Sequence, residues 1–155
     1  MSLIVRRAGP QDAVRIRNVH VASIRGLCAL DYAPAVIRAW SSDKRPENYR
    51  RSMAQGESMF LALAGGRTAG FAGIKDDEVR AVYVHPRFAR RGVGAALLAA
   101  LERRARVRRV RSLHLSSSVT AAPFYRAMGY TTVRKGTFTL RDGARMACVH
   151  MAKEL

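Results

Sequence analysis

The stretch that most constrains the fold is residues 82–98, which read Val-Tyr-Val-His-Pro-Arg-Phe-Ala-Arg-Arg-Gly-Val-Gly-Ala-Ala-Leu-Leu. Its β-rich start ends at His85-Pro86, because proline cannot donate a hydrogen bond to a sheet ladder. Apolar residues repeat every four positions after Gly92, which predicts a helix over Gly92–Arg106. A strand that passes through a basic, glycine-containing turn into a helix indicates a sheet with a helix packed on it.

The remaining segments add strands and helices on both sides of this unit. Short apolar runs bounded by turn residues predict strands, and three- to four-residue spacing of apolar residues predicts helices. The expected strands are Leu3–Ala8, Met59–Ala64, Thr68–Lys75, Glu78–Val84, Val110–Leu115, Thr131–Leu140 and Ala144–Ala152. The expected helices are 10–24, Ala35–Trp40, Pro46–Gln55, Gly92–Arg106 and Thr120–Met128. This order argues for an α+β domain built on one sheet.

Length and composition bound the class of protein. A chain of 155 residues is expected to form one domain, residues 1–155. No apolar run is long enough for a membrane helix, and Met1–Pro10 lacks the apolar core of a signal peptide. Cys28 and Cys148 match no metal-ligand spacing, so no metal is expected. We expect both to be free thiols in the cytoplasm.

The formal charge of +17 comes from 24 Arg and 4 Lys against 11 acidic residues. We interpret most of it as a solvated basic surface, with part of the excess available to a polyanionic ligand. The run Arg103–Arg111 has no interleaved aromatic residue on which nucleic-acid bases could stack. The sequence therefore argues against a specific nucleic-acid surface.

The turn before the central helix has the features of an anion site. Glycines let the backbone approach a ligand closely, and a helix start supplies unpaired N–H donors with partial positive charge. Arg90 and Arg91 add full charges. A dinucleotide fingerprint would need glycine where Leu97 stands, and no Walker loop is present. The pattern suits a diphosphate without being either of those motifs.

Two motifs resemble the GNAT superfamily of N-acetyltransferases. Residues 89–94, Ala-Arg-Arg-Gly-Val-Gly, match the pattern Arg/Gln-x-x-Gly-x-Gly/Ala except at Ala89, which leaves Arg90 or Arg91 to supply the missing donor. Residues 122–130 are similar to the family's Pro-Phe-Tyr-x-x-x-Gly-Phe/Tyr segment. The resemblance implies a three-layer α/β fold, with a mixed, mostly antiparallel sheet of about seven strands flanked by about four or five helices.

The resemblance also implies acetyl-CoA as cosubstrate. The fourth and fifth strands would splay apart, and the thioester arm would enter the gap along the main chain of Val82–Val84. Amides of Arg90–Ala95 would hold the diphosphate, and Ser117 or Ser118, after the fifth strand, would contact the arm. The residues expected at acetyl-CoA are Val82, Tyr83, Val84, Ala89, Arg90, Arg91, Gly92, Val93, Gly94, Ala95, Ser117, Ser118 and Tyr125.

The implied reaction is direct attack of a primary amine on the thioester, with Tyr125 as the acid that protonates the leaving thiolate. A backbone N–H near Val82 or Tyr83 would stabilise the oxyanion. The amine proton would go to water, to Glu78 or to another base. Strand alternation places Glu78 on the same face as Arg80, Val82 and Val84.

Other assignments stay open. His20 is interpreted as a buried, hydrogen-bonded side chain, and the alternative is a titratable group near the acceptor cleft. Trp40 is interpreted as a core residue, and the alternative places Trp40 and Tyr32 in the lining of the acceptor pocket. The alternatives to an enzyme are a GNAT-fold domain that only binds an acyl-CoA and, less favoured, a basic nucleic-acid-binding protein. The acceptor amine is not identified by the sequence, and the oligomeric state is open between a monomer and a homodimer.

Overall fold

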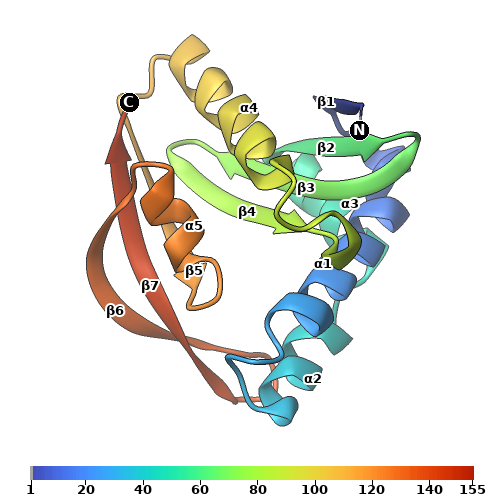
Figure 1. Ribbon diagram of the computed structural model, residues 1–155, viewed down its shortest axis with the longest axis vertical. Helices are drawn as coiled ribbons and strands as arrows, with labels where there is room; N and C mark the ends of the chain where they lie inside the picture. The colour runs from blue at the N-terminus through green and yellow to red at the C-terminus, as the bar shows by residue number, and fades with distance from the viewer. Residues whose placement is uncertain (1) are drawn as a thin grey trace.

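The computed structural model describes residues 2–155 as one seven-stranded sheet with helices on both faces (Figure 1). The strands are β1 (Leu3–Arg7), β2 (Ser58–Ala64), β3 (Arg67–Lys75), β4 (Glu78–Val84), β5 (Ser112–Ser118), β6 (Thr131–Thr139) and β7 (Arg145–Glu154). The helices are α1 (Ala13–Leu27), α2 (Pro34–Ser42), α3 (Pro46–Ala54), α4 (Val93–Val107) and α5 (Ala122–Ala127). The expected mixed sheet and its flanking helices are confirmed, and every element lies where the sequence predicts it to within a few residues.

The sheet order β1-β2-β3-β4-β5-β7-β6 contains one parallel pair, β4 with β5. This pair is short: Glu78 lies opposite His114 and Val79 opposite Leu115, and no further partners follow. The other pairs are antiparallel and run over most of their strands. The sheet is therefore closed at the start of β4 and open beyond Val79, as the expected splay requires.

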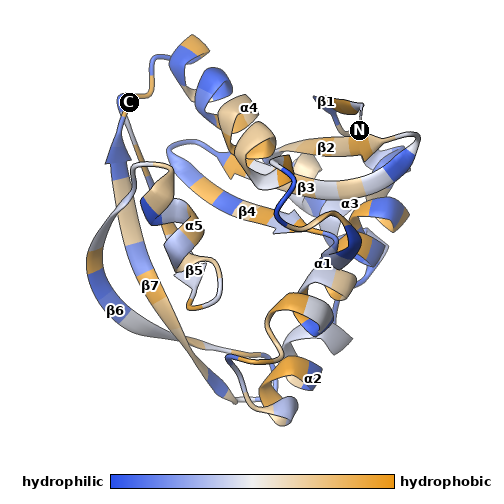
Figure 2. Cartoon of the chain, in the orientation of Figure 1, coloured by the Kyte–Doolittle hydropathy of each residue, from blue (hydrophilic) through white to orange (hydrophobic). Residues whose placement is uncertain are grey.

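Two cores cover the two faces of the sheet. On one face, α4 and α5 pack on the strands through Leu97, Leu101 and Tyr125. On the other face, α1 packs through Ile16 and Val19 against β2 and β3. Figure 2 shows the hydrophobic stretches of the central strands and the hydrophilic C-terminal end of α4. The open part of the sheet lies between α4 and α5 on one side and faces α1 and α2 on the other (Figure 1).

A buried ionic cluster fixes α4 relative to the strands that follow α5. Lys153 Nζ lies 3.0 Å from Glu102 Oε2 and donates to the Met128 carbonyl at 2.9 Å. The Tyr130 hydroxyl donates to the same carboxylate at 3.0 Å. The cluster therefore ties α4 to β7 and to the segment that follows α5.

The entrance to α1 depends on Asp12. Its carboxylate accepts hydrogen bonds from both terminal nitrogens of Arg6 and from the Gly9 amide, each at 2.9 Å. Hydrogen bonds that involve a charged group typically contribute about 1.5–3 kcal/mol. We expect Asp12→Ala to lower the free energy of unfolding by about this amount, measured by urea denaturation. The control is Glu154→Ala, which also removes one negative charge but at an exposed side chain. It should have little effect on the free energy of unfolding.

The same carboxylate predicts an acid-dependent loss of stability. The Arg6 hydrogen bond holds the pKa of Asp12 below its ordinary value. A carboxyl with a lowered pKa stabilises the fold above its unfolded pKa, and the contribution is lost as the pH falls through the folded pKa. The gap in stability between the wild type and Asp12→Ala should therefore narrow below about pH 4. A gap that stays constant down to pH 2 would contradict the assignment.

Candidate active site

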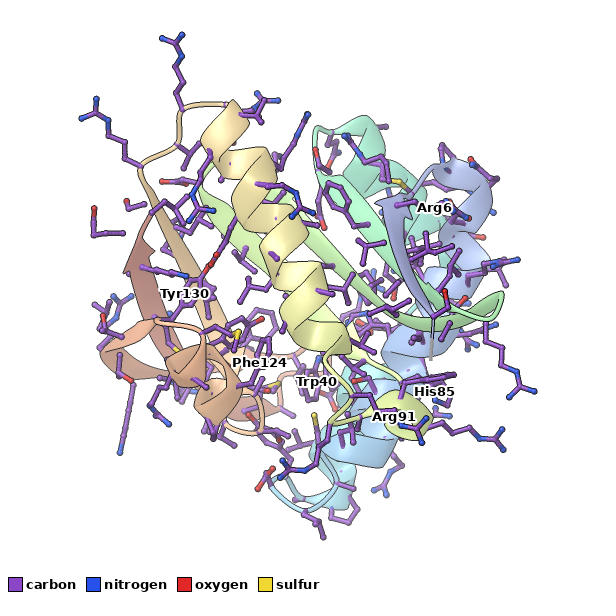
Figure 3. All side chains as sticks on the ribbon, turned by 45° about the horizontal axis from the view of Figure 1, so that its top comes forward. Arg6, Trp40, His85, Arg91, Phe124 and Tyr130 are labelled. Carbon is purple, nitrogen blue, oxygen red and sulfur yellow. The ribbon has the colours of Figure 1, made fainter. Side chains whose placement is uncertain are left out.

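A cavity of about 670 Å³ opens beside the gap between β4 and β5. Ten residues expected at acetyl-CoA line it: Val82, Tyr83, Val84, Ala89, Arg90, Gly92, Val93, Gly94, Ala95 and Ser118. A smaller cavity of about 20 Å³ lies in the gap itself and is lined by Tyr83, Ser117 and Tyr125 among others. Arg91, labelled in Figure 3, is exposed and lines neither cavity.

The turn before α4 presents a run of unused backbone donors. Within residues 2–155, no hydrogen bond uses the amides of residues 92–95, and the first helical bond runs from Ala96 to the Gly92 carbonyl at 3.0 Å. Arg90 and Gly92 have left-handed φ angles of 60° and 81°, which curve the backbone sharply. Four successive free amides at a helix N-terminus can bind a diphosphate.

Within the protein itself, the two glycines of this turn are constrained for different reasons. A β-carbon at Gly92 would meet nothing within 4 Å, so its left-handed φ is what favours glycine. A β-carbon at Gly94 would lie 3.1 Å from the ring of Phe124. Gly94 therefore allows α4 to approach α5 across the cavity.

Tyr125 lines the gap between β4 and β5. Only 5% of the residue is exposed, and it lines the smaller cavity beneath the end of β4. Its ring packs edge-on against Phe124 and Tyr130. Burial raises the pKa of Tyr125, which keeps the phenol protonated at neutral pH. No hydrogen bond among residues 2–155 uses this hydroxyl, so it is free to donate to a bound group.

The serines expected after the fifth strand belong to it, because β5 extends to Ser118. The extension comes from pairing with β7, where Ser117 lies opposite Val149 and Ser118 opposite Cys148. Serine has a low intrinsic strand preference. The strand predicted from the sequence, Val110–Leu115, therefore ends too early. Ser117 lines the smaller cavity, and Ser118 lines both.

A β-bulge in β4 corrects the expected alternation. Ile74 pairs with Val79 while Gly73 pairs with Ala81, so Arg80 is an extra residue on β4. Val82 and Val84 consequently pack on the α4 face, whereas Ala81 and Tyr83 pack on the α1 face. A bulge shifts every later side chain to the other side of the sheet. Glu78 and Val82 were therefore wrongly placed on one face.

Glu78 lies at the closed end of the gap. Its carboxylate is 3.4 Å from Arg80 Nε, and both side chains are partly exposed. It lines neither cavity, although Arg80 lines the smaller one. A proton acceptor at this position would have to act through water.

The α1 side of the gap is aromatic. Trp40 is 7% exposed and packs in the core, as expected. His20 is buried, with Nδ1 at 2.8 Å from the Tyr49 hydroxyl and its ring 4.2 Å from that of Tyr83. Its Nε2 has no partner within residues 2–155, so the expectation of a satisfied histidine holds for one nitrogen only. Burial lowers the pKa of His20 well below its ordinary value and favours the neutral ring.

Hydrogen bonds of Asp31 and Tyr32 hold the far end of the gap together, and the sequence analysis did not predict them. The Tyr32 hydroxyl donates to the Ala147 carbonyl at 2.6 Å and accepts from the Val119 amide at 2.8 Å. Asp31 accepts from the Thr120 hydroxyl at 2.7 Å. These contacts join the loop after α1 to β7 and to the β5–α5 loop. They span more than 80 residues of sequence, so no local pattern could have revealed them.

Residues 2–155 contain neither a metal-ligand cluster nor a membrane-spanning helix. No group of three or more His, Cys, Asp or Glu side chains in this range is arranged to hold a metal ion. Within the same range, no helix is long and apolar enough to cross a lipid bilayer.

The split parallel pair and the free amides before α4 are the features of an acyltransferase. Comparison with known families identifies which family of acyltransferases this is. Residues 28–155 match the model of the acetyltransferase (GNAT) domain. The chain therefore belongs to the GNAT acetyltransferase family.

Individual relatives agree with this assignment. A crystal structure of a GCN5-related N-acetyltransferase from Rhodopseudomonas palustris is 32% identical, covering 100% of this chain and 97% of that one, with a TM-score of 0.93. An uncharacterized N-acetyltransferase of Escherichia coli, YafP, is 26% identical over an alignment of 133 residues, and the match covers 79% of this chain and 84% of that protein. The PaiA N-acetyltransferase of Thermoplasma acidophilum, solved with coenzyme A, shares the fold at 18% identity and a TM-score of 0.79, with full coverage of both chains.

Proposed function

We propose that residues 1–155 act as one catalytic domain that transfers an acetyl group from acetyl-CoA to a primary amine by direct attack. The observation that carries the proposal is the cavity beside the split strands, which has the free amides of Gly92–Ala95 at one end, and the adjoining gap, which is lined by Tyr125. The amides suit the diphosphate, and the unpaired edge of β4 suits the amide groups of the pantetheine arm. The alternative is a domain that binds an acyl-CoA without catalysis, and such a domain would not require the Tyr125 hydroxyl.

The mechanism assigns one task to each part of the site. The amine nitrogen attacks the thioester carbonyl, and a backbone N–H near Val82 or Tyr83 stabilises the oxyanion. Tyr125 protonates the departing thiolate. Glu78, through water, is one candidate for the base that accepts the amine proton. Holding both reactants in line is the main contribution of the protein.

The setting in which the enzyme works is also a proposal. We place it in the cytoplasm, where Cys28 and Cys148, both free and buried, stay reduced. The amine acceptor is a small molecule or a peptide, and a homodimer is compatible with the exposed edge strand β6.

Binding of acetyl-CoA is the first test. A ligand at a hundred times its Kd stabilises the native state by about 2.7 kcal/mol, which for a domain of this size raises Tm by about 5–10 °C. Differential scanning fluorimetry with acetyl-CoA should show this shift, and adenosine, which lacks the diphosphate, should not. Release of free thiol from acetyl-CoA over a panel of amines then tests catalysis. No shift at millimolar acetyl-CoA would refute the proposal.

A further inference from the structure

The open face of β5 and β7 carries a serine–histidine pair that the mechanism above does not use. Ser116 and His150 lie opposite each other in the β5–β7 register. The Ser116 hydroxyl is 2.8 Å from His150 Nδ1. Ser116 is exposed and His150 is half-buried, so the pair is accessible from outside the sheet.

Ser116 also borders the gap where the thioester would react. It lines the smaller cavity together with Arg80, Tyr83 and Tyr125. The neighbours Leu115 and Ser117 are buried on the α4 and α5 side, and alternation along β5 places Ser116 on the opposite side. Tyr125 and Ser116 therefore border one cavity from opposite faces of the sheet.

The position of the imidazole depends on the neighbouring strand. A β-carbon at Gly136 of β6 would lie 2.5 Å from His150 Nε2, so only glycine leaves room for the ring. Nε2 lies 3.9 Å from Cys148 Sγ, a weak partner for an N–H. With its proton on Nε2, the ring presents the Nδ1 lone pair to Ser116. The pair is thereby oriented to take a proton from the cavity.

We propose, on the basis of the acetyltransferase function above, that Ser116 and His150 form the relay that accepts the proton of the attacking amine. As the N–C bond forms, the amine proton passes to Ser116 Oγ and the Ser116 proton passes to His150 Nδ1. The C–S bond breaks, and the thiolate takes the Tyr125 proton. His150 then releases its proton to solvent, and Tyr125 regains one. Ser116 is the catalytic residue of the relay, and His150 acts through it.

Other bases are less well placed for this role. Glu78 is at the closed end, ion-paired with Arg80, and lines neither cavity. His20 is buried and bonded to Tyr49. His114 faces the same side as Ser116 but lies opposite Glu78 in register and contacts Asp77 at 3.1 Å. Among these groups, only Ser116 borders the cavity and has a partner beyond it to receive the proton.

The test is a double-mutant cycle with hydroxylamine as the acceptor, because a nucleophile this small needs no specific acceptor pocket. Thiol release is measured at saturating acetyl-CoA for Ser116→Ala, His150→Ala and the double variant. Each single change should lower kcat about 100-fold, the low end of general acid–base effects, with no change in the KM for acetyl-CoA. The double variant should be no slower than either single one, because the two groups act as a unit.

Added imidazole separates a relay from a merely structural role. It should restore turnover to His150→Ala but not to the double variant, which lacks the serine. His114→Ala, a change of the same kind on the same face, should behave as the wild type. The acetyl-CoA melting shift confirms that each variant is folded and binds the cosubstrate.

Several outcomes would overturn the relay while leaving the proposed function intact. They are additive losses in the double variant, an effect confined to KM, a larger loss in Glu78→Gln than in His150→Ala, or an acetyl group on Ser116 found by mass spectrometry. Wild-type protein that binds acetyl-CoA but transfers nothing to hydroxylamine would overturn the catalytic proposal and the relay together. Absence of the acetyl-CoA melting shift would instead refute the proposed function itself.

Discussion

Replacing Tyr125 with phenylalanine is expected to lower kcat about 10- to 100-fold, a barrier increase of about 1.4–2.8 kcal/mol. The variant keeps the ring and its edge-on contacts with Phe124 and Tyr130 but loses the hydroxyl that lines the gap. The loss is at the low end for acid catalysis because a thiol has a pKa of about 8.5, so its thiolate leaves without much help.

Steady-state thiol release measures the effect, with Tyr130→Phe as the matched control. That second hydroxyl donates to Glu102 away from the gap, so its loss should lower stability and leave kcat unchanged. The Tyr125→Phe variant should bind acetyl-CoA as the wild type does. Unchanged kcat, under conditions where the chemical step limits the rate, would leave water as the proton donor.

Introducing valine at Gly94 is expected to weaken acetyl-CoA binding about 5- to 150-fold, which corresponds to an overpacking cost of about 1–3 kcal/mol. The new side chain would begin 3.1 Å from the Phe124 ring and would enter the cavity between α4 and α5. Either the ring moves into the space of the pantetheine arm or the helices separate, and both outcomes disturb the site.

Isothermal titration calorimetry gives the affinity directly. Ala99→Val is the control, because Ala99 is exposed on the same helix and receives the same branched side chain. It should bind acetyl-CoA with unchanged affinity. If Gly94→Val also binds as tightly as the wild type, the cosubstrate does not pass between α4 and α5.

The elements of this fold were predictable because their signals are local. Pro10, Pro34 and Pro46 stand at helix starts, where a missing N–H costs nothing. Turns at Gly65-Gly66 and Asp142-Gly143 separate strands whose hydrophobicity is evident within a few residues. Local propensity and tertiary packing agree at these positions, so the sequence was sufficient.

The face of each side chain in the site was less predictable. The bulge at Arg80 moved Val82 and Val84 away from the face of Glu78. This bulge arises from the pairing of β4 with β3, and no residue within β4 indicates it. Likewise, Ser116, Ser117 and Ser118 form a strand because β7 provides partners for their backbone. Both features depend on a neighbouring strand, which a pattern within one segment cannot report.

The sequence by itself determined the family, located the turn that presents free amides, and singled out Tyr125 as a residue of the site. These features depend on short motifs with fixed spacing. Only the tertiary structure decided that β4 and β5 part after Val79, which opens the gap. It also brought Ser116 to His150, 34 residues apart, and Tyr32 to Ala147, 115 residues apart. Such contacts arise where distant strands and loops pack together, and the free energy that forms them belongs to the whole sheet and not to any one segment.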